Sequence, residues 1–184
     1  MKLDLARTDK PYYDAPGEPV VRTFPVHRYV TATGSGAPLG ERYSEAVAAV
    51  YRAAYGAKKI AKAAGTDFVV PKLEGLWWVE SDQPPLSVPR EQWHWTMMIR
   101  MPDSVSADMI SGAVFEELSE GECVQVMHRG PYADEPETLA RMAAFMDAEG
   151  LLMNGRHHEI YLTDPRRTQD SGMRTILRHP VRRG

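Results

Sequence analysis

The sequence predicts an α+β protein in which one β-α-β-β unit is used twice. Stretches rich in β-branched and aromatic residues, typical of strands, alternate with stretches whose apolar residues recur every three or four positions, typical of helices. In chain order the elements read strand, helix, strand, strand, a short helix, and then strand, helix, strand, strand again. No sequence repeat is visible, so the duplication is inferred from the element order alone. Each unit is expected to place its helix on one sheet face and to leave the other face free to curve around a ligand.

The first half begins with a proline-containing segment, residues 1–19, which we expect to be an extended lead-in. One strand should follow within residues 19–34, and a glycine-rich loop should lead from it into a helix over residues 41–64. The two remaining strands of this half are predicted within residues 67–80 and 93–102, joined by a connection that contains three prolines.

The second half repeats this order after a short predicted helix that begins near Ser104 or Ser106 and ends at Leu118. The other elements are a strand over 122–128, a helix from Asp134 to Gly150, and strands within 156–162 and 173–181. The first turn of the 134–150 helix holds Glu135 and Glu137, which suit the positive end of a helix dipole. The halves are thus expected at about 20–103 and 120–184, within a single domain over 20–184.

The charge balance and the single cysteine narrow the class of protein. Among 184 residues, 22 Lys and Arg face 25 Asp and Glu, so no strong field favours binding to nucleic acid or to an anionic membrane. Cys123 cannot form an intramolecular disulfide, and its strand-like setting predicts a buried structural thiol. The first residues are too polar for a signal peptide and no apolar run could span a bilayer, so we expect a soluble cytoplasmic protein.

A carboxylate stands in the middle of the apolar strand 156–162. Period-two alternation puts His158 and Ile160 on one face, and His157, Glu159 and Tyr161 on the other. The apolar pair of Ile160 and Leu162 should pack under the helices, so Glu159 is expected on the helix-free face. Alternation leaves open whether that face meets solvent or lines a pocket.

All four tryptophans fall within one predicted hairpin, which favours the pocket. Trp77 and Trp78 lie on its first strand, and Trp93 and Trp95 on its second. Some of them could be ordinary core residues, but aromatic walls with few polar groups are typical of small-molecule sites. Glu74 is a second candidate carboxylate, with a strand-end or ion-pairing role as the alternative.

Several short motifs together resemble the GyrI-like small-molecule-binding domains. The second half carries the pattern H-x-G-P-Y from His128 to Tyr132, then Gly150-Leu151, then Glu159-Ile160-Tyr161, with Asp164-Pro165 after it. Residues 69–78 and 89–103 resemble a stand-alone branch of the same superfamily. The matches cover most of the chain from about Tyr43 onward.

The resemblance implies a duplicated β-α-β-β (SHS2-like) fold, whose two halves form a curved antiparallel sheet pair with a central ligand cleft and helices on the outer face. In multidrug-sensing relatives the glutamate that matches Glu159 meets the ligand. Those sensor domains are usually fused to a helix-turn-helix module, for which the short lead-in has no room, so direct binding to DNA is not expected.

The stand-alone branch is similar to proteins that hydrolyse cyclopropane-bearing DNA-alkylating natural products of the duocarmycin and yatakemycin type. This likeness implies an enzyme in which Glu159 activates water, helped by a pKa that a partly apolar pocket raises. Tyr132, Tyr161 or His157 would supply a donor where charge grows on the dienone oxygen. The residues expected to contact the substrate are Trp77, Trp78, Trp93, Trp95, Glu74, Tyr55 and His157.

Other functions stay open at this point. Because His157 and His158 point to opposite strand faces and no other carboxylate–histidine spacing indicates a preorganised site, no metal is expected, and no other cofactor either. A protein that sequesters planar aromatic compounds without chemistry, or that acts on DNA gyrase, would need the same aromatic walls.

Overall fold

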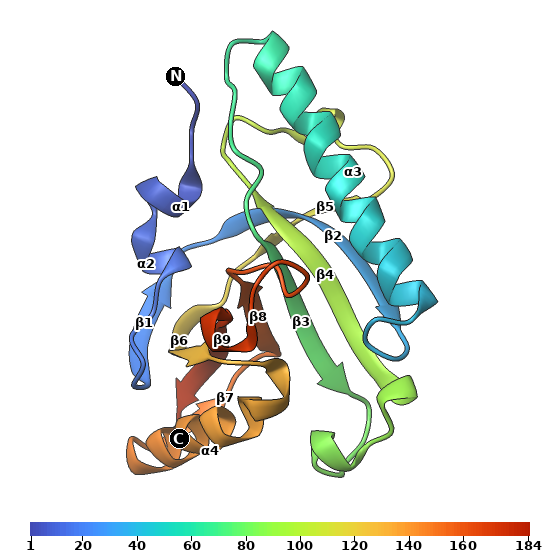
Figure 1. Ribbon diagram of the computed structural model, residues 1–184. Coiled ribbons are helices and arrows are strands. Elements are labelled where there is room, and N and C mark those ends of the chain that lie inside the picture. Colours follow the sequence, from blue (N-terminus) through green and yellow to red (C-terminus); the bar gives the residue numbers. More distant parts are fainter. The chain divides into compact units, whose positions relative to one another are not determined.

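The computed structural model describes residues 1–184, and the chain divides into two compact units (Figure 1). Unit 1 consists of Met1–Thr8 and His27–Leu118, and unit 2 of Asp9–Val26 and Ser119–Gly184. Each unit contains one long helix and its own antiparallel strands. The predicted α+β class, with antiparallel strands and two main helices, is therefore confirmed.

Unit 1 is a four-stranded antiparallel arrangement with one long helix on it. Its strand order is β3-β4-β2-β5, and helix α3 packs against β2 and β4 (Figure 1). The elements are β2 (His27–Ser35), α3 (Glu41–Ala63), β3 (Leu73–Val79), β4 (Trp93–Met101) and β5 (Val114–Leu118).

The face of α3 that packs against the sheet is lined by buried alanines. Ala53, Ala57 and Ala61 are spaced by four, are buried, and share a core with Val30 and Ile99 of the strands. Small side chains at this spacing let the helix backbone approach the sheet closely while larger strand residues fill the space between them. The predicted 41–64 helix is thus confirmed, and it continues through Gly56.

Unit 2 has the strand order β1-β6-β9-β8, with β7 pairing the end of β9. Helix α4 packs against β6 and β7, and its Met142 and Met146 share a core with Val124, Val126 and Leu177. The elements are β1 (Val20–Phe24), β6 (Gly121–Arg129), α4 (Glu135–Ala148), β7 (Leu151–Met153), β8 (His157–Tyr161) and β9 (Arg174–Arg183).

The sheet face of unit 2 that lies opposite α4 is covered by the N-terminal segment. Arg178 of β9 is fully buried there and donates from Nη2 to the carbonyl oxygen of Tyr12 at 2.8 Å. Its guanidinium carbon lies 3.9 Å from the centre of the Phe24 ring and 4.5 Å from that of Tyr12, and its Nε and Nη2 both reach Gln125. The expectation of an extended lead-in is wrong, because the short helices α1 (Leu5–Thr8) and α2 (Lys10–Tyr13) form there and Tyr12 and Tyr13 are buried.

Three other expectations about elements are corrected by the structure. The single strand predicted within 19–34 is two strands, because the chain leaves β1 at Phe24-Pro25-Val26 and enters β2 in the other unit. The helix predicted from Ser104 or Ser106 to Leu118 is a 3-10 turn, Ala107–Met109, followed by β5, which pairs β2. The short strand β7 was not predicted.

Two expectations about chemistry and membranes can also be compared with the structure. Cys123 is buried, and burial raises the pKa of its thiol to about 12, so the side chain stays a thiol as the strand-like setting predicted. No helix has both the length and the apolar composition that crossing a bilayer requires.

Candidate active site

Strand β8 carries the central carboxylate of the site, on the sheet face that helix α4 covers. In the pairing of β8 with β9, Glu159 lies opposite Leu177, and partners in an antiparallel pair share a face. Leu177 belongs to the core under α4. The expectation that Glu159 points to the helix-free face is therefore wrong, and His158 and Ile160 occupy the face opposite α4 instead.

Alternation along β8 correctly groups the three polar residues around one carboxylate. The Glu159 side chain is buried, with 8% of its surface exposed. His157 Nε2 lies 2.7 Å from Glu159 Oε2, and the Tyr161 hydroxyl donates to Oε1 at 3.1 Å. Donors therefore reach both oxygen atoms of Glu159, which fixes its orientation.

A second histidine extends this chain to the neighbouring strand. His179 of β9 lies with Nε2 at 2.7 Å from His157 Nδ1, and the two rings meet edge to face. Burial lowers the pKa of His179 to about 3, so it is neutral near neutral pH. Because an ionised Glu159 can only accept, His157 must carry a proton on Nε2, whichever histidine donates between Nδ1 and His179. His157 therefore positions Glu159.

The pKa of Glu159 is shifted in the direction opposite to the one expected. Burial alone would raise it, but hydrogen bonds from His157, the charge of His157, and hydrogen bonds from Glu135 and Tyr161 together lower it to about 2. The carboxylate is thus ionised at neutral pH and is a weak base when taken by itself. The notion of an apolar pocket that makes Glu159 more basic is wrong.

The raised pKa belongs to Glu135, the first residue of α4. One oxygen or nitrogen atom from each of Glu135, His157 and Glu159 lies within 4.8 Å of the others. Burial, followed by the charge of Glu159 and the hydrogen bond with it, raises the pKa of Glu135 to about 10. The pair therefore holds one proton at neutral pH, and Glu135 carries it.

The junction between β6 and α4 places Glu135 against β8. His128, the last residue but one of β6, is buried, with Nδ1 2.7 Å from the Thr138 hydroxyl and Nε2 2.9 Å from the Pro131 carbonyl oxygen. Because a carbonyl oxygen only accepts, Nε2 donates and the Thr138 hydroxyl donates to Nδ1. Gly130 has φ 115°, a conformation that favours glycine. The H-x-G-P motif thus ties the start of α4 to the sheet.

Glu135 and His179 were not predicted to belong to the site, for different reasons. An acidic residue in the first turn of a helix has a sufficient explanation in the helix dipole, so nothing marked Glu135 as functional. His179 lies on a strand without a motif, and only the β8–β9 register brings it to His157. No carboxylate–histidine spacing in the sequence indicated a preorganised site, yet the fold brings Glu135, His157 and Glu159 close enough to offer ligand atoms to one ion.

Tyr132, a predicted catalytic residue, lies at the edge of this cluster. It belongs to the 3-10 turn η4 (Tyr132–Asp134), which precedes α4, and 38% of its surface is exposed. Its ring centre is 6.0 Å from that of Tyr161, with the rings edge to face. The structure thus brings Tyr132, Tyr161, His157 and Glu159 together.

The predicted tryptophans form an aromatic cluster within unit 1. Trp77 and Trp95 are cross-strand partners on the α3 face of β3 and β4, and Tyr43 of α3 stacks on Trp77 and meets Trp95 edge to face. Trp93 meets Trp77 edge to face. Trp95 exposes only 1% of its surface and donates from Nε1 to Gly36, so it is a core residue. Trp77 and Trp93 are half-buried.

The other predicted substrate contacts in unit 1 lie apart from that cluster. Trp78 and Glu74 point to the face opposite α3, where Trp78 stacks on His94 and Glu74 is fully buried. Tyr55 lies on α3 with 56% of its surface exposed. The structure therefore does not bring Tyr55 together with the tryptophans.

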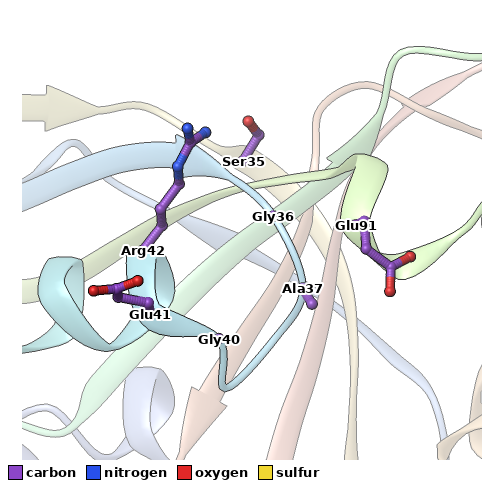
Figure 2. Close-up of a pocket in the computed structure, with 7 residues that line it drawn as sticks. All are labelled: Ser35, Gly36, Ala37, Gly40, Glu41, Arg42 and Glu91. Carbon is purple, nitrogen blue, oxygen red and sulfur yellow. The ribbon is translucent and has the colours of Figure 1, made fainter.

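A separate open pocket of about 320 Å³ lies in unit 1 where β2 leads into α3 (Figure 2). Glu41, Arg42 and Glu91 are its charged lining residues, and the backbone of the Gly36 loop forms one side (Figure 2). It contains no aromatic residue and none of the predicted site residues. It is therefore not the aromatic cleft that the sequence suggested.

The fold and the cluster around Glu159 define a class: an α+β ligand-binding domain with a buried carboxyl–histidine site. The chain belongs to the GyrI-like family, since the model of the GyrI-like small molecule binding domain matches residues 17–182. The resemblance inferred from the motifs is thus confirmed. No curated protein matches the chain.

Three solved structures from Listeria innocua are similar to this chain over its whole length. Two are described as hydrolases and are 35% and 34% identical, with TM-scores of 0.88 and 0.85, covering 99% and 98% of this chain and 100% of their own. A third, an uncharacterized conserved protein, is 36% identical with a TM-score of 0.91, covering 98% of this chain and 100% of its own.

Proposed function

We propose that this protein hydrolyses the activated cyclopropane ring of planar, hydrophobic DNA-alkylating compounds of the duocarmycin and yatakemycin type. Such a reaction in the cytoplasm would detoxify the compound before it reaches DNA. Support comes from the family, which binds small molecules, and from the two similar Listeria proteins described as hydrolases. The observation that carries the proposal is the buried Glu159 carboxylate, held at both oxygen atoms.

Ring opening by water needs a base at the water and a donor at the oxygen atom that gains charge. Glu159 is the proposed base, and its fixed orientation offsets its low intrinsic basicity, because positioning a reactive group removes much of an entropic barrier. Trp77 and Trp93, both half-buried on the same sheet face, are the proposed contacts of the flat substrate, and Trp78, on the opposite face, is proposed as a contact on the resemblance alone. The role of Tyr55 and Glu74 in binding is proposed on the resemblance alone.

The test is incubation with a spiro-cyclopropane dienone and detection of the water adduct by mass spectrometry. Glu159→Gln should lower turnover by roughly 10²-fold or more, the usual contribution of a general base, while tryptophan quenching still reports binding. Glu137→Gln is the matched control, since Glu137 is an exposed carboxylate in the first turn of α4. Full activity in Glu159→Gln would refute the assignment of the base.

A second function is favoured by the low pKa of Glu159. A buried carboxylate that remains ionised suits an ion pair with an aromatic cation, and a binding or sequestering protein needs no base. This function predicts that N-methylacridinium binds more tightly than neutral acridine, that Glu159→Gln removes the difference, and that the dienone is recovered unchanged. A related role as a gyrase effector predicts retention of gyrase on the immobilised protein without any added compound.

A further inference from the structure

Glu135 is a half-buried residue whose carboxyl group the proposed reaction has not yet used. Its Oε1 atom is buried and has no hydrogen-bond partner. Leaving an ionised oxygen atom in that state is costly, whereas a protonated carboxyl group tolerates it much better. The geometry therefore favours a neutral Glu135 in contact with an ionised Glu159.

The surrounding groups place the negative charge on Glu159 and not on Glu135. From β8, His157 and Tyr161 both donate to Glu159. From β9, the neutral His179 lies within hydrogen-bond distance of His157, and from β6, His128 is bonded to Thr138 and Pro131. Tyr132 and Asp134 in η4 precede the helix. The raised pKa of Glu135, about 10, agrees with this distribution of hydrogen bonds.

We propose that Glu135 is the acid of this site: it shares one proton with Glu159 and gives that proton to the oxygen atom on which charge develops as the ring opens. This inference rests on the proposed function. The water oxygen atom bonds to the ring methylene carbon, and the strained carbon–carbon bond breaks. Its electron pair moves through the dienone to the oxygen atom, which takes the proton of Glu135. The water proton passes to Glu159.

This assignment closes the proton balance without any other reactant. The carboxyl pair starts with one proton and ends with one proton, which only needs to return from Glu159 to Glu135. The product is a phenol, and a phenol has a pKa of about 10. As the water proton reaches Glu159, the charge that helps to raise the pKa of Glu135 disappears, so Glu135 becomes a stronger acid while the phenolate oxygen atom develops. The Tyr161 hydroxyl, one of the three expected donors, already donates to Glu159.

The variant Glu135→Gln tests whether Glu135 acts as an acid or has only a structural role. The test compares two dienones whose phenol products differ in acidity. The amide keeps the size of the side chain but cannot transfer a proton. The variant should lose about 10²-fold or more in kcat on a dienone whose product is an ordinary phenol. On a dienone with an electron-withdrawing ring substituent, whose phenolate leaves without a proton, the loss should be much smaller. Equal losses on both substrates would overturn the proposal.

Two further measurements keep this inference distinct from the proposed function. Infrared spectra at neutral pH should contain the carbonyl band of a protonated carboxylic acid that disappears in Glu135→Gln and persists in Glu137→Gln, whether or not any cyclopropane is opened. Absence of that band would overturn the shared proton even if the dienone is hydrolysed. Loss of activity on chelation, restored by a divalent cation, would also overturn it, because the three residues would then hold a metal.

Discussion

Glu135 and Glu159 are chemically alike and lie in contact, yet their surroundings move their pKa values in opposite directions. Hydrogen bonds from His157 and Tyr161 hold the pKa of Glu159 at about 2, while burial beside that charge raises the pKa of Glu135 to about 10. The difference comes from which carboxyl group the donors reach. A pair of this kind contains both an acid and a base at one pH, as acid–base hydrolysis requires.

The raised pKa of Glu135 has a consequence for stability. Above the ordinary value of 4.5 the unfolded chain loses this proton, whereas the folded chain keeps it until about pH 10. The folded state binds more protons in that window, so stability falls as pH rises through it. Glu135→Gln removes the effect, and its melting temperature should fall less than that of the wild type between about pH 5 and about pH 9. Parallel decreases in the two proteins would contradict the raised pKa, and Glu137→Gln should follow the wild type.

About half of this site could be predicted from the sequence, because the residues of that half lie on one strand and strand alternation alone groups them. Period-two alternation groups His157, Glu159 and Tyr161 without any knowledge of tertiary structure. It cannot tell which face a helix will cover, and so the helix-free face was chosen wrongly for Glu159. Glu135 arrives from another element, and only the packing of α4 brings it to β8.

At the scale of the elements, the end of β2 is fitted to the largest buried side chain of unit 1. A Cβ atom added at Gly34 would lie 2.8 Å from the ring of Trp95, which exposes 1% of its surface. Trp95 is fixed by its hydrogen bond to Gly36 and by Tyr43, so the ring cannot move aside easily. The glycine is thus required by packing.

Gly34→Ala should therefore lower the free energy of unfolding by about 1–3 kcal/mol, the usual effect of overpacking a core. Gly56→Ala is the matched control, because Gly56 lies inside α3 with nothing within 4 Å of the added atom. That variant should be more stable by roughly 0.5–1 kcal/mol, since alanine favours a helix. Denaturant titration checks both, and an unchanged midpoint for Gly34→Ala would contradict the close fit.

The elements that were predicted correctly have a strong apolar periodicity. Those that were missed form only because another strand is available to pair with them. The spacing of alanines and valines in α3 specifies a helix over most of its length. Residues 114–118 form a strand because β2 offers an edge to pair with, which no local pattern reveals. A single strand was predicted across Pro25 because the segments on both sides of it are rich in β-branched residues.

At the scale of the whole molecule, the chain passes between the two units three times. Residues 1–8 belong to unit 1, 9–26 to unit 2, 27–118 to unit 1 and 119–184 to unit 2. The predicted halves at 20–103 and 120–184 therefore do not coincide with the compact units, because β1 pairs β6 across about a hundred residues of sequence. An element order that looks duplicated does not reveal such an exchange of strands.

The N-terminal segment contributes separately to each unit. Leu3 forms an isolated bridge with Phe68 in unit 1. In unit 2, the carbonyl oxygen of Tyr12 accepts from Arg178, and that of Pro16 accepts from the backbone N–H of Met127 at 2.8 Å. The groups that the segment bonds in this way, Phe68, Met127 and Arg178, are buried, so the segment is part of the fold.

Deletion of residues 1–19 should therefore lower the free energy of unfolding by about 3 kcal/mol or more, because it removes an acceptor from a buried guanidinium. The loss of stability arises because the buried guanidinium of Arg178 is left without that acceptor. Arg178→Met in the truncated chain should therefore recover part of the lost stability, whereas the same change in the full chain should destabilise it. Thermal and denaturant unfolding of the four proteins measures this coupling. Equal effects of Arg178→Met in the full and truncated chains would contradict the proposed dependence of Arg178 on the N-terminal segment.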